Sequence, residues 1–152
     1  MIKRVKMNTA WQQELIELFR GAPIAGFFGM TLSYDKQGHA HFILPYNPNL
    51  DHAGKGIHGG AIATLLDNAG WFAVAAQKEG VLVATSEFKI HLLYPVRERE
   101  LHAEGWVVKS GKRISIAEMR VSASDGELVA IGMGTYVTIE GVSMWEIGSN
   151  AP

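Results

Sequence analysis

The stretch GIHGGAIATLLDNAGWFAVAAQ, residues 56–77, decides the fold. From residue 61 to residue 76 it is mostly small and apolar, but glycine, aspartate and asparagine interrupt it too often for a membrane span. The pattern predicts a buried helix from Gly59 to Lys78. Asp67 lies near the middle of this helix, where a carboxylate held away from water costs several kcal/mol unless it is paired or neutralised. Its presence there calls for a functional explanation.

Polar residues form one narrow stripe on this helix. Residues three and four apart share a helical face, and five positions line up in this way: Gly60, Thr64, Asp67, Asn68 and Trp71. The other faces carry alanine, leucine, isoleucine and phenylalanine, which we expect to pack against a sheet. A solvated polar face is the alternative interpretation, although the stripe is only one residue wide.

Two glycines, Gly59 and Gly60, mark the start of the helix. N–H groups of a first helical turn favour negative charge, and glycines leave no side chain to block a ligand. A plain turn is the alternative. Gly60 and Asp67 are about 10 Å apart along the axis, so one carbonyl group cannot contact both in one chain. We therefore predict a symmetric dimer whose antiparallel helices bring Asp67 of one chain to Gly60 of the other.

The rest of the chain predicts an α+β protein. One long central helix should be wrapped by an antiparallel sheet of five to six strands, with a short N-terminal helix from Thr9 to Arg20. Thr9 and Gln12 are expected to form a capping box. Strands are expected at residues 27–34, 39–44, 85–95, 101–109, 113–124 and 127–139.

We expect residues 1–152 to form a single domain with a core over residues 21–139 and a loose tail over residues 140–152. In the third strand, alternation predicts one polar face and one apolar face. The polar face would carry Glu87, Lys89 and His91, and the apolar face Phe88, Ile90 and Leu92.

Composition limits the function. A formal net charge of -1 lacks the basic footprint of nucleic-acid binding, and the lack of cysteine excludes disulfides and thiolate chemistry. There is no G-x-S-x-G motif to support an α/β-hydrolase mechanism. Residues 54–59, GKGIHG, match G-x-G-x-x-G, but no strand precedes them, so a dinucleotide site is rejected. The N-terminus is no secretory signal, and we expect a cytoplasmic protein without membrane or nucleic-acid partners.

Two histidines could supply half of a metal site. His39 and His41 lie two apart on one strand face. No carboxylate partner is apparent in the sequence, so no metal site is predicted. His91, His102 and Trp106 are interpreted as ordinary strand and packing residues.

The motif HGGAIATLLDNA, residues 58–69, resembles the PaaI-type hotdog-fold acyl-CoA thioesterases. The resemblance extends over about residues 21–139 and includes FFGMTL at 27–32, FKIHLLYPV at 88–96 and KSGKRISIAEMRV at 109–121. It implies a hotdog fold and hydrolysis of an acyl-CoA thioester. No cofactor is implied, since coenzyme A is part of the substrate.

The resemblance also implies roles for individual residues. Asp67 would act as nucleophile or general base, the Gly60 amide would polarise the thioester carbonyl, and His58 would order the turn before the helix. Thr85 would lie near the attacking water. The implied substrate contacts are Gly59, Thr64, Asn68 and Trp71 near the reacting end, and Lys109, Lys112 and Arg113 at the phosphates of coenzyme A. For this basic cluster a solvated hairpin is the alternative.

His52 departs from the family pattern, in which an amide residue often stands six positions before His58. A histidine titrates near neutral pH, so His52 could bond the carbonyl or share the role of base. Two other functions stay open. One is a hydratase or dehydratase of the same fold, favoured by YNPNLDH at residues 46–52, and the other is a non-catalytic acyl-CoA sensor. A homodimer or a dimer of dimers is expected, and the acyl group is not predicted.

Overall fold

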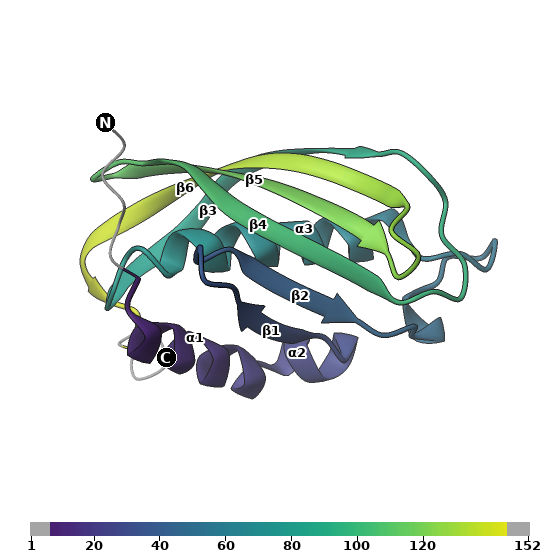
Figure 1. Ribbon diagram of the computed structural model, residues 1–152, viewed down its shortest axis with the longest axis horizontal. Helices are drawn as coiled ribbons and strands as arrows, with labels where there is room; N and C mark the ends of the chain where they lie inside the picture. Colours follow the sequence, from purple (N-terminus) through teal and green to yellow (C-terminus); the bar gives the residue numbers. More distant parts are fainter. Residues whose placement is uncertain (1–6, 146–152) are drawn as a thin grey trace, which may run out of the picture.

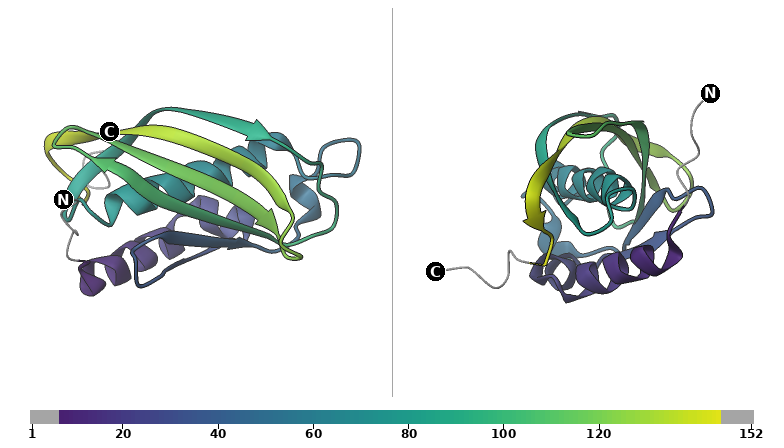
Figure 2. Two further views of the ribbon diagram at one scale, coloured as in Figure 1. Left: turned by 45° about the horizontal axis from the view of Figure 1, so that its top comes forward. Right: turned by 90° about the vertical axis from the view of Figure 1, so that its left-hand side faces the viewer.

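A six-stranded antiparallel sheet curls around one long helix in the computed structural model, which describes residues 7–145 (Figure 1). The strand order is β1-β2-β4-β5-β6-β3, so β1 and β3 form the two edges. The end-on view in Figure 2 shows α3 inside the curl, with α1 lying along its open side. The expected α+β class is confirmed.

Each helix and strand has the following bounds. The helices are α1 (Thr9–Gly21), α2 (Pro23–Phe28) and α3 (Gly59–Ala75), with a short 3-10 helix η1 (Pro48–Leu50). The strands are β1 (Thr31–Tyr34), β2 (Ala40–Leu44), β3 (Val81–Leu92), β4 (Leu101–Ser110), β5 (Ile114–Ala123) and β6 (Leu128–Ser143).

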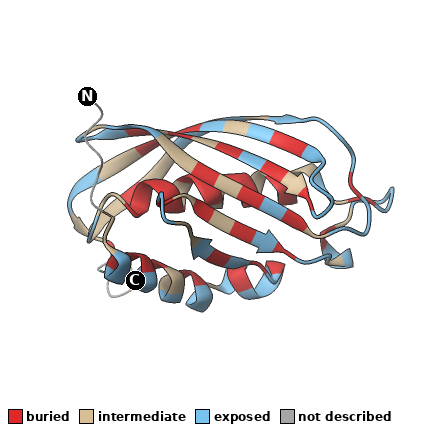
Figure 3. Ribbon diagram, in the orientation of Figure 1, coloured by how far each residue is buried: buried red, intermediate tan, exposed pale blue. Residues whose placement is uncertain are grey.

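Helix α3 is the centre of the core. Its leucines and most of its alanines are buried against the concave face of the sheet, as Figure 3 shows by the run of buried residues along it. Within residues 7–145, no helix has the length and apolar character that a membrane span requires.

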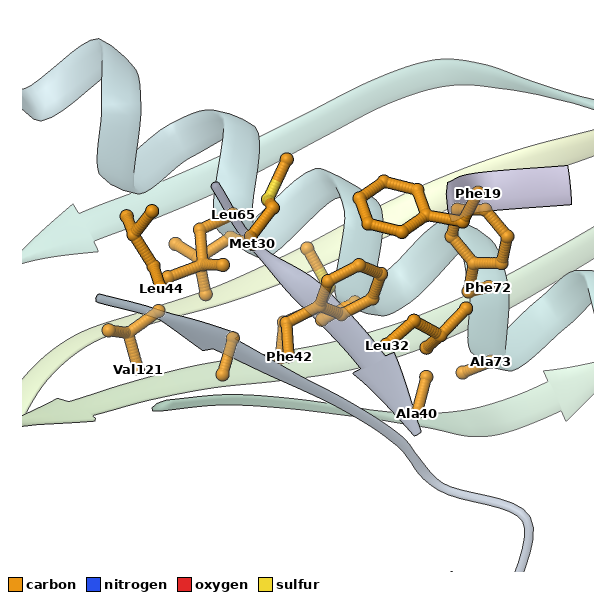
Figure 4. Close-up of a cluster of buried hydrophobic side chains, with 14 of the residues drawn as sticks. Phe19, Met30, Leu32, Ala40, Phe42, Leu44, Leu65, Phe72, Ala73 and Val121 are labelled. Carbon is orange, nitrogen blue, oxygen red and sulfur yellow. The ribbon is translucent and has the colours of Figure 1, made fainter. Parts of the chain in front are cut away.

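Aromatic rings join the outer helix to this core. Phe19 of α1 meets Phe42 of β2 edge-on at 5.0 Å and Phe72 of α3 at 5.3 Å (Figure 4). Each such pair contributes about 0.5–1.5 kcal/mol beyond the burial of its area. The contacts hold α1 beside α3, and this position forms one wall of the site described below.

Glycines let α3 lie close to the sheet. A Cβ atom on Gly105 would stand 2.2 Å from the Ala69 carbonyl oxygen, so β4 touches the helix backbone only because it has glycine there. Cβ atoms on Gly70 and Gly134 would stand 2.1 and 2.8 Å from atoms of Tyr136. These two glycines make the space that lets the Tyr136 ring lie beneath α3.

Strand β3 is a long edge strand that is buried only at its beginning. The expectation of one polar and one apolar face is wrong for its second half, because side chains of both sets are exposed there. Phe88 is 37% exposed and Leu92 is 51% exposed, and Ile90 is half-buried. A register shift between Thr85 and Glu87 coincides with this change. Beyond Thr85, most side chains of β3 are exposed in the described chain, although Ile90 still packs against the core.

Three local predictions are corrected. Asn8, and not Thr9, caps α1, since its side-chain oxygen accepts hydrogen bonds from the N–H groups of Ala10 and Trp11. Residues 27 and 28, expected in a strand, end the short helix α2, which begins at Pro23. The expected tail at 140–152 starts too early, because β6 continues to Ser143. Residues 146–152 lie outside the described part of the chain.

Candidate active site

Asp67 projects from the middle of α3 toward strand β3. The Thr85 hydroxyl donates a hydrogen bond to Asp67 Oδ1 at 2.9 Å. The hydroxyl of Tyr136 makes a long contact of 3.5 Å with the same oxygen. The other oxygen, Oδ2, has no hydrogen-bond partner within residues 7–145. One carboxylate oxygen is therefore anchored, and the other is available.

Burial raises the pKa of Asp67 above its usual value, and the hydrogen bonds from Thr85 and Tyr136 offset only part of this effect. Burial also raises the pKa of Tyr136, and the negative charge of Asp67 adds to the increase. Tyr136 therefore stays protonated and can donate to the carboxylate. A poorly hydrated aspartate with a raised pKa is a stronger base than an exposed one.

A cavity of about 720 Å³ opens beside Asp67. Its walls come from α1, the α1–α2 turn, α2, α3 and β3, and they are mostly apolar. The lining residues are Glu17, Leu18, Phe19, Gly21, Ala22, Ile24, Asp67, Asn68, Trp71, Phe72 and Thr85. A few polar groups at one wall of an apolar cavity are typical of a small-molecule site.

The start of α3 differs from the expectation in one respect. His58 orders the turn as predicted, but it does so because its Nδ1 accepts a hydrogen bond of 2.8 Å from the Gly60 N–H. The expected open amide at Gly60 is therefore occupied. The Gly59 N–H has no acceptor within the described chain, so the open amide at this helix end belongs to Gly59.

The other stripe residues mostly bond to the helix itself. The Thr64 hydroxyl donates to the Gly60 carbonyl at 3.0 Å, and the Asn68 amide donates to the Thr64 carbonyl at 2.8 Å. Asn68 lines the cavity, but Thr64 does not. Trp71 also lines it, with its indole N–H held by the Val83 carbonyl at 2.9 Å.

His52 does not join Asp67 within one chain. Its Nδ1 accepts from the Gly54 N–H at 2.9 Å in the loop before α3, and the ring does not line the cavity. The basic residues Lys109, Lys112 and Arg113 are exposed at the β4–β5 hairpin. Lys112 and Arg113 each lie 3.6 Å from the Glu140 carboxylate.

Tyr136 is the site residue that the sequence analysis missed. It is fully buried on β6, where it pairs with Thr85 on one side and Ser115 on the other. A buried tyrosine needs a partner for its hydroxyl, and that rule alone could have singled it out. Its partner could not be named, since 69 residues separate Tyr136 from Asp67.

A curled antiparallel sheet around one helix, with a half-buried carboxylate on that helix, defines a hotdog-fold protein with a carboxylate-centred site. The chain belongs to the thioesterase superfamily, whose family model matches residues 54–130. The matched region contains Gly59, Asp67 and Thr85, and the resemblance to PaaI-type thioesterases is confirmed.

Individual relatives agree with this assignment. A protein of Saccharolobus solfataricus, named as an esterase on a provisional basis, is 30% identical over 127 residues, which cover 82% of this chain and 83% of that protein. The PaaI protein of the E. coli phenylacetic acid degradation operon has the same fold, with a TM-score of 0.79, 21% identity and coverage of 90% and 99%. A Bacillus halodurans protein solved with CoA has a TM-score of 0.73, 26% identity and coverage of 88% and 92%.

Proposed function

We propose that this protein hydrolyses acyl-CoA thioesters and that Asp67 is its catalytic carboxylate. The observation that carries the proposal is the state of Asp67: half-buried, anchored through Oδ1 by Thr85, and part of the wall of a mostly apolar cavity. Membership of the thioesterase superfamily supports the thioester as the bond that is broken.

We infer that each site is completed by a second copy of the chain. Gly59 and Asp67 are eight residues apart, about 12 Å along α3, whereas reacting groups must approach to about 3 Å. Antiparallel α3 helices from two chains would bring the open Gly59 amide of one chain to Asp67 of the other. The exposed second half of β3 supports this arrangement, because an uncovered edge strand is suited to pair with its own copy.

The chemistry follows from these positions. The substrate carbonyl oxygen accepts a hydrogen bond from the Gly59 N–H, which stabilises the negative charge that develops there. Asp67 Oδ2 takes a proton from water as the water oxygen attacks the carbonyl carbon. The carbon–sulfur bond then breaks, the proton passes to the sulfur, and a carboxylic acid and free CoA leave. Direct attack by Asp67 on the carbonyl carbon is the alternative, distinguished by single-turnover hydrolysis in heavy-oxygen water, which would label the protein.

The basic hairpin is proposed to hold the phosphates of coenzyme A. Ser115 lies in the same cross-strand row as Thr85 and Tyr136, and Arg113 is two residues further along, about 7 Å. The positive charge of Arg113 therefore lies two strands away from Thr85 and two residues beyond the row, within the reach of an extended ligand such as coenzyme A. The CoA bound by the Bacillus halodurans relative supports this class of ligand.

A thiol-release assay with DTNB tests the function. We expect turnover of acyl-CoA by the native chain and a loss of about 10²–10⁴-fold in Asp67→Asn, which keeps the Thr85 hydrogen bond but cannot accept a proton. Asp67→Ala should be equally inactive. The matched control is Asp125→Asn, which alters an exposed carboxylate in the β5–β6 turn, outside both the candidate active site and the cavity, and should hydrolyse at the native rate.

The same assay separates the alternatives. A hydratase would change enoyl absorbance without releasing thiol, and a sensor would bind acyl-CoA saturably with neither signal. Full activity in Asp67→Asn would refute the proposed mechanism. A panel of aryl, medium-chain and branched substrates would identify the acyl group, for which the apolar cavity favours a hydrophobic one. The cytoplasmic location and the choice between dimer and dimer of dimers stay predictions.

A further inference from the structure

Two histidines and two carboxylates converge on the face of the sheet opposite α3. Asp35 comes from the β1–β2 turn and Glu104 from β4. His39 directly precedes β2, and His41 lies in β2. One ligand atom from each residue lies within 4.8 Å of all the others. The premise that His39 and His41 have no carboxylate partner is therefore wrong. We propose that these four residues form a structural zinc site.

The contacts among these atoms form one connected set and not separate pairs. His39 Nδ1 lies 3.3 Å from Asp35 Oδ2 and 3.0 Å from Glu104 Oε1. The same Asp35 oxygen lies 3.1 Å from His41 Nε2. Zinc bonds of about 2.0–2.1 Å in a tetrahedron place neighbouring ligand atoms about 3.3 Å apart. Three of the six separations are thus already within a few tenths of an ångström of the zinc geometry.

Other contacts orient both carboxylates toward this centre. Asp35 Oδ1 accepts hydrogen bonds from the N–H groups of Gln37 and His39 at 2.8 and 2.9 Å, which leaves Oδ2 to point at the histidines. Arg120 bonds Glu104 through Oε2, which leaves Oε1 on the cluster side. Partners that fix the direction of a ligand in this way are usual around protein metal sites.

Imidazole nitrogens and carboxylate oxygens in equal number match the preferences of zinc, and four protein ligands leave no open position for catalysis. Glu104 lies between Ala103 and Gly105, which are buried on the α3 side, so its own side chain is on the opposite face from Asp67. The role we assign is structural: the ion would join the β1–β2 turn to β4 and hold this edge of the sheet.

The test titrates ZnSO₄ into tag-free, chelator-dialysed protein and follows heat, stoichiometry and thermal unfolding. We expect one zinc per chain and, at about 100 times the Kd, a Tm increase of about 5–10 °C. Asp35→Asn keeps the Oδ1 acceptor of the turn and removes only the ligand oxygen. It should weaken zinc binding by at least about 100-fold, because loss of even an outer-shell partner costs about 10–100-fold.

His102→Gln is the matched control. His102 also faces outward from β4 and contacts a carboxylate, that of Glu100 at 2.7 Å, but it belongs to no convergent set. It should bind zinc as the native chain does. His41→Gln serves as a second ligand variant, with circular dichroism to verify that both variants are folded. Absence of zinc binding to the native chain, or equal binding by Asp35→Asn and His41→Gln, would overturn the site.

Discussion

Thr85 and Asp67 are joined by a 2.9 Å hydrogen bond that connects the edge strand β3 to the central helix α3. The bond anchors the carboxylate at the point where β3 changes from buried to exposed. A second chain that pairs with the exposed half of β3 would therefore lie next to Thr85, whose hydrogen bond favours the charged form of Asp67. Position and protonation of the carboxylate both depend on this contact.

Removing the Thr85 hydroxyl should shift the acid limb of the pH–rate profile. The hydroxyl lowers the pKa of Asp67 against the larger opposite effect of burial, so Thr85→Val should raise this pKa further. A base works only when it is deprotonated, and kcat/KM should therefore begin to fall at a higher pH in the variant. Thr85→Ser keeps the hydroxyl and should restore the native profile. An unshifted pH–rate profile in Thr85→Val would show that Thr85 does not affect the pKa of Asp67.

Replacing Asp67 should stabilise the fold at neutral pH. Because the pKa of Asp67 is higher in the folded chain than its usual 3.8, the folded state binds the proton more tightly. The contribution of Asp67 to stability is therefore greatest at low pH and is lost as pH rises from 3.8 through the raised native pKa. Asp67→Asn escapes this loss, and its Tm at pH 7 should therefore exceed that of the native chain, by a margin that solvent screening of the partly exposed group keeps small.

Calorimetric scans at two pH values would check this expectation. The gain in Asp67→Asn should disappear near pH 3, where the native aspartate is protonated as well. A Tm below the native value at neutral pH would contradict a destabilising charge at this position.

The two glycines at the start of α3 should respond differently to alanine. A Cβ on Gly60 would stand 2.9 Å from His58 Nδ1 and displace the cap, and loss of a cap costs about 0.5–2 kcal/mol. A Cβ on Gly59 would meet the Leu92 Cδ1 atom at 2.7 Å, which is the movable end of a side chain. Denaturant unfolding should therefore show a larger loss of stability for Gly60→Ala than for Gly59→Ala. A larger loss of stability for Gly59→Ala than for Gly60→Ala would contradict the role of His58 as the cap of α3.

A charge on the exposed half of β3 should break the proposed dimer. Phe88 is 37% exposed in one chain, and a buried, unpaired carboxylate at an interface is strongly unfavourable. Sedimentation velocity should show a dimer for the native chain and a monomer for Phe88→Asp, together with a loss of turnover. Leu128→Asp has a similar exposure, 39%, but lies near the β5–β6 hairpin and should keep the dimer. A native chain that is monomeric and active would refute the shared site.

Local patterns were sufficient to predict the central helix and its carboxylate. The helical period and the position of Asp67 are properties of one continuous segment; the helix begins at Gly59 as predicted but ends at Ala75, three residues before the predicted Lys78. The N-cap was displaced by one residue because Asn8 and Thr9 are both good capping residues. The short apolar run at Phe27 is ambiguous between helix and strand, and Pro23, a favoured first residue of a helix, was the overlooked signal.

What the sequence could not indicate was pairing across the sheet. Asp67 meets Tyr136 across 69 residues, and His39 meets Glu104 across 65. These contacts depend on strand order and register, neither of which has a local signature. The prediction that the Gly60 amide is open failed for a different reason. The Gly60 N–H donates a hydrogen bond to the side chain of His58, so it is not available to a ligand.

The long open border of β3 has a consequence for how such a protein behaves in a cell. Unpaired peptide groups along the edge of this twelve-residue strand can form hydrogen bonds with unrelated chains as well as with a second copy of the protein. If the active site is shared between two chains as proposed, dilution below the dissociation constant of the dimer should lower the specific activity, and protein abundance would then regulate turnover per molecule.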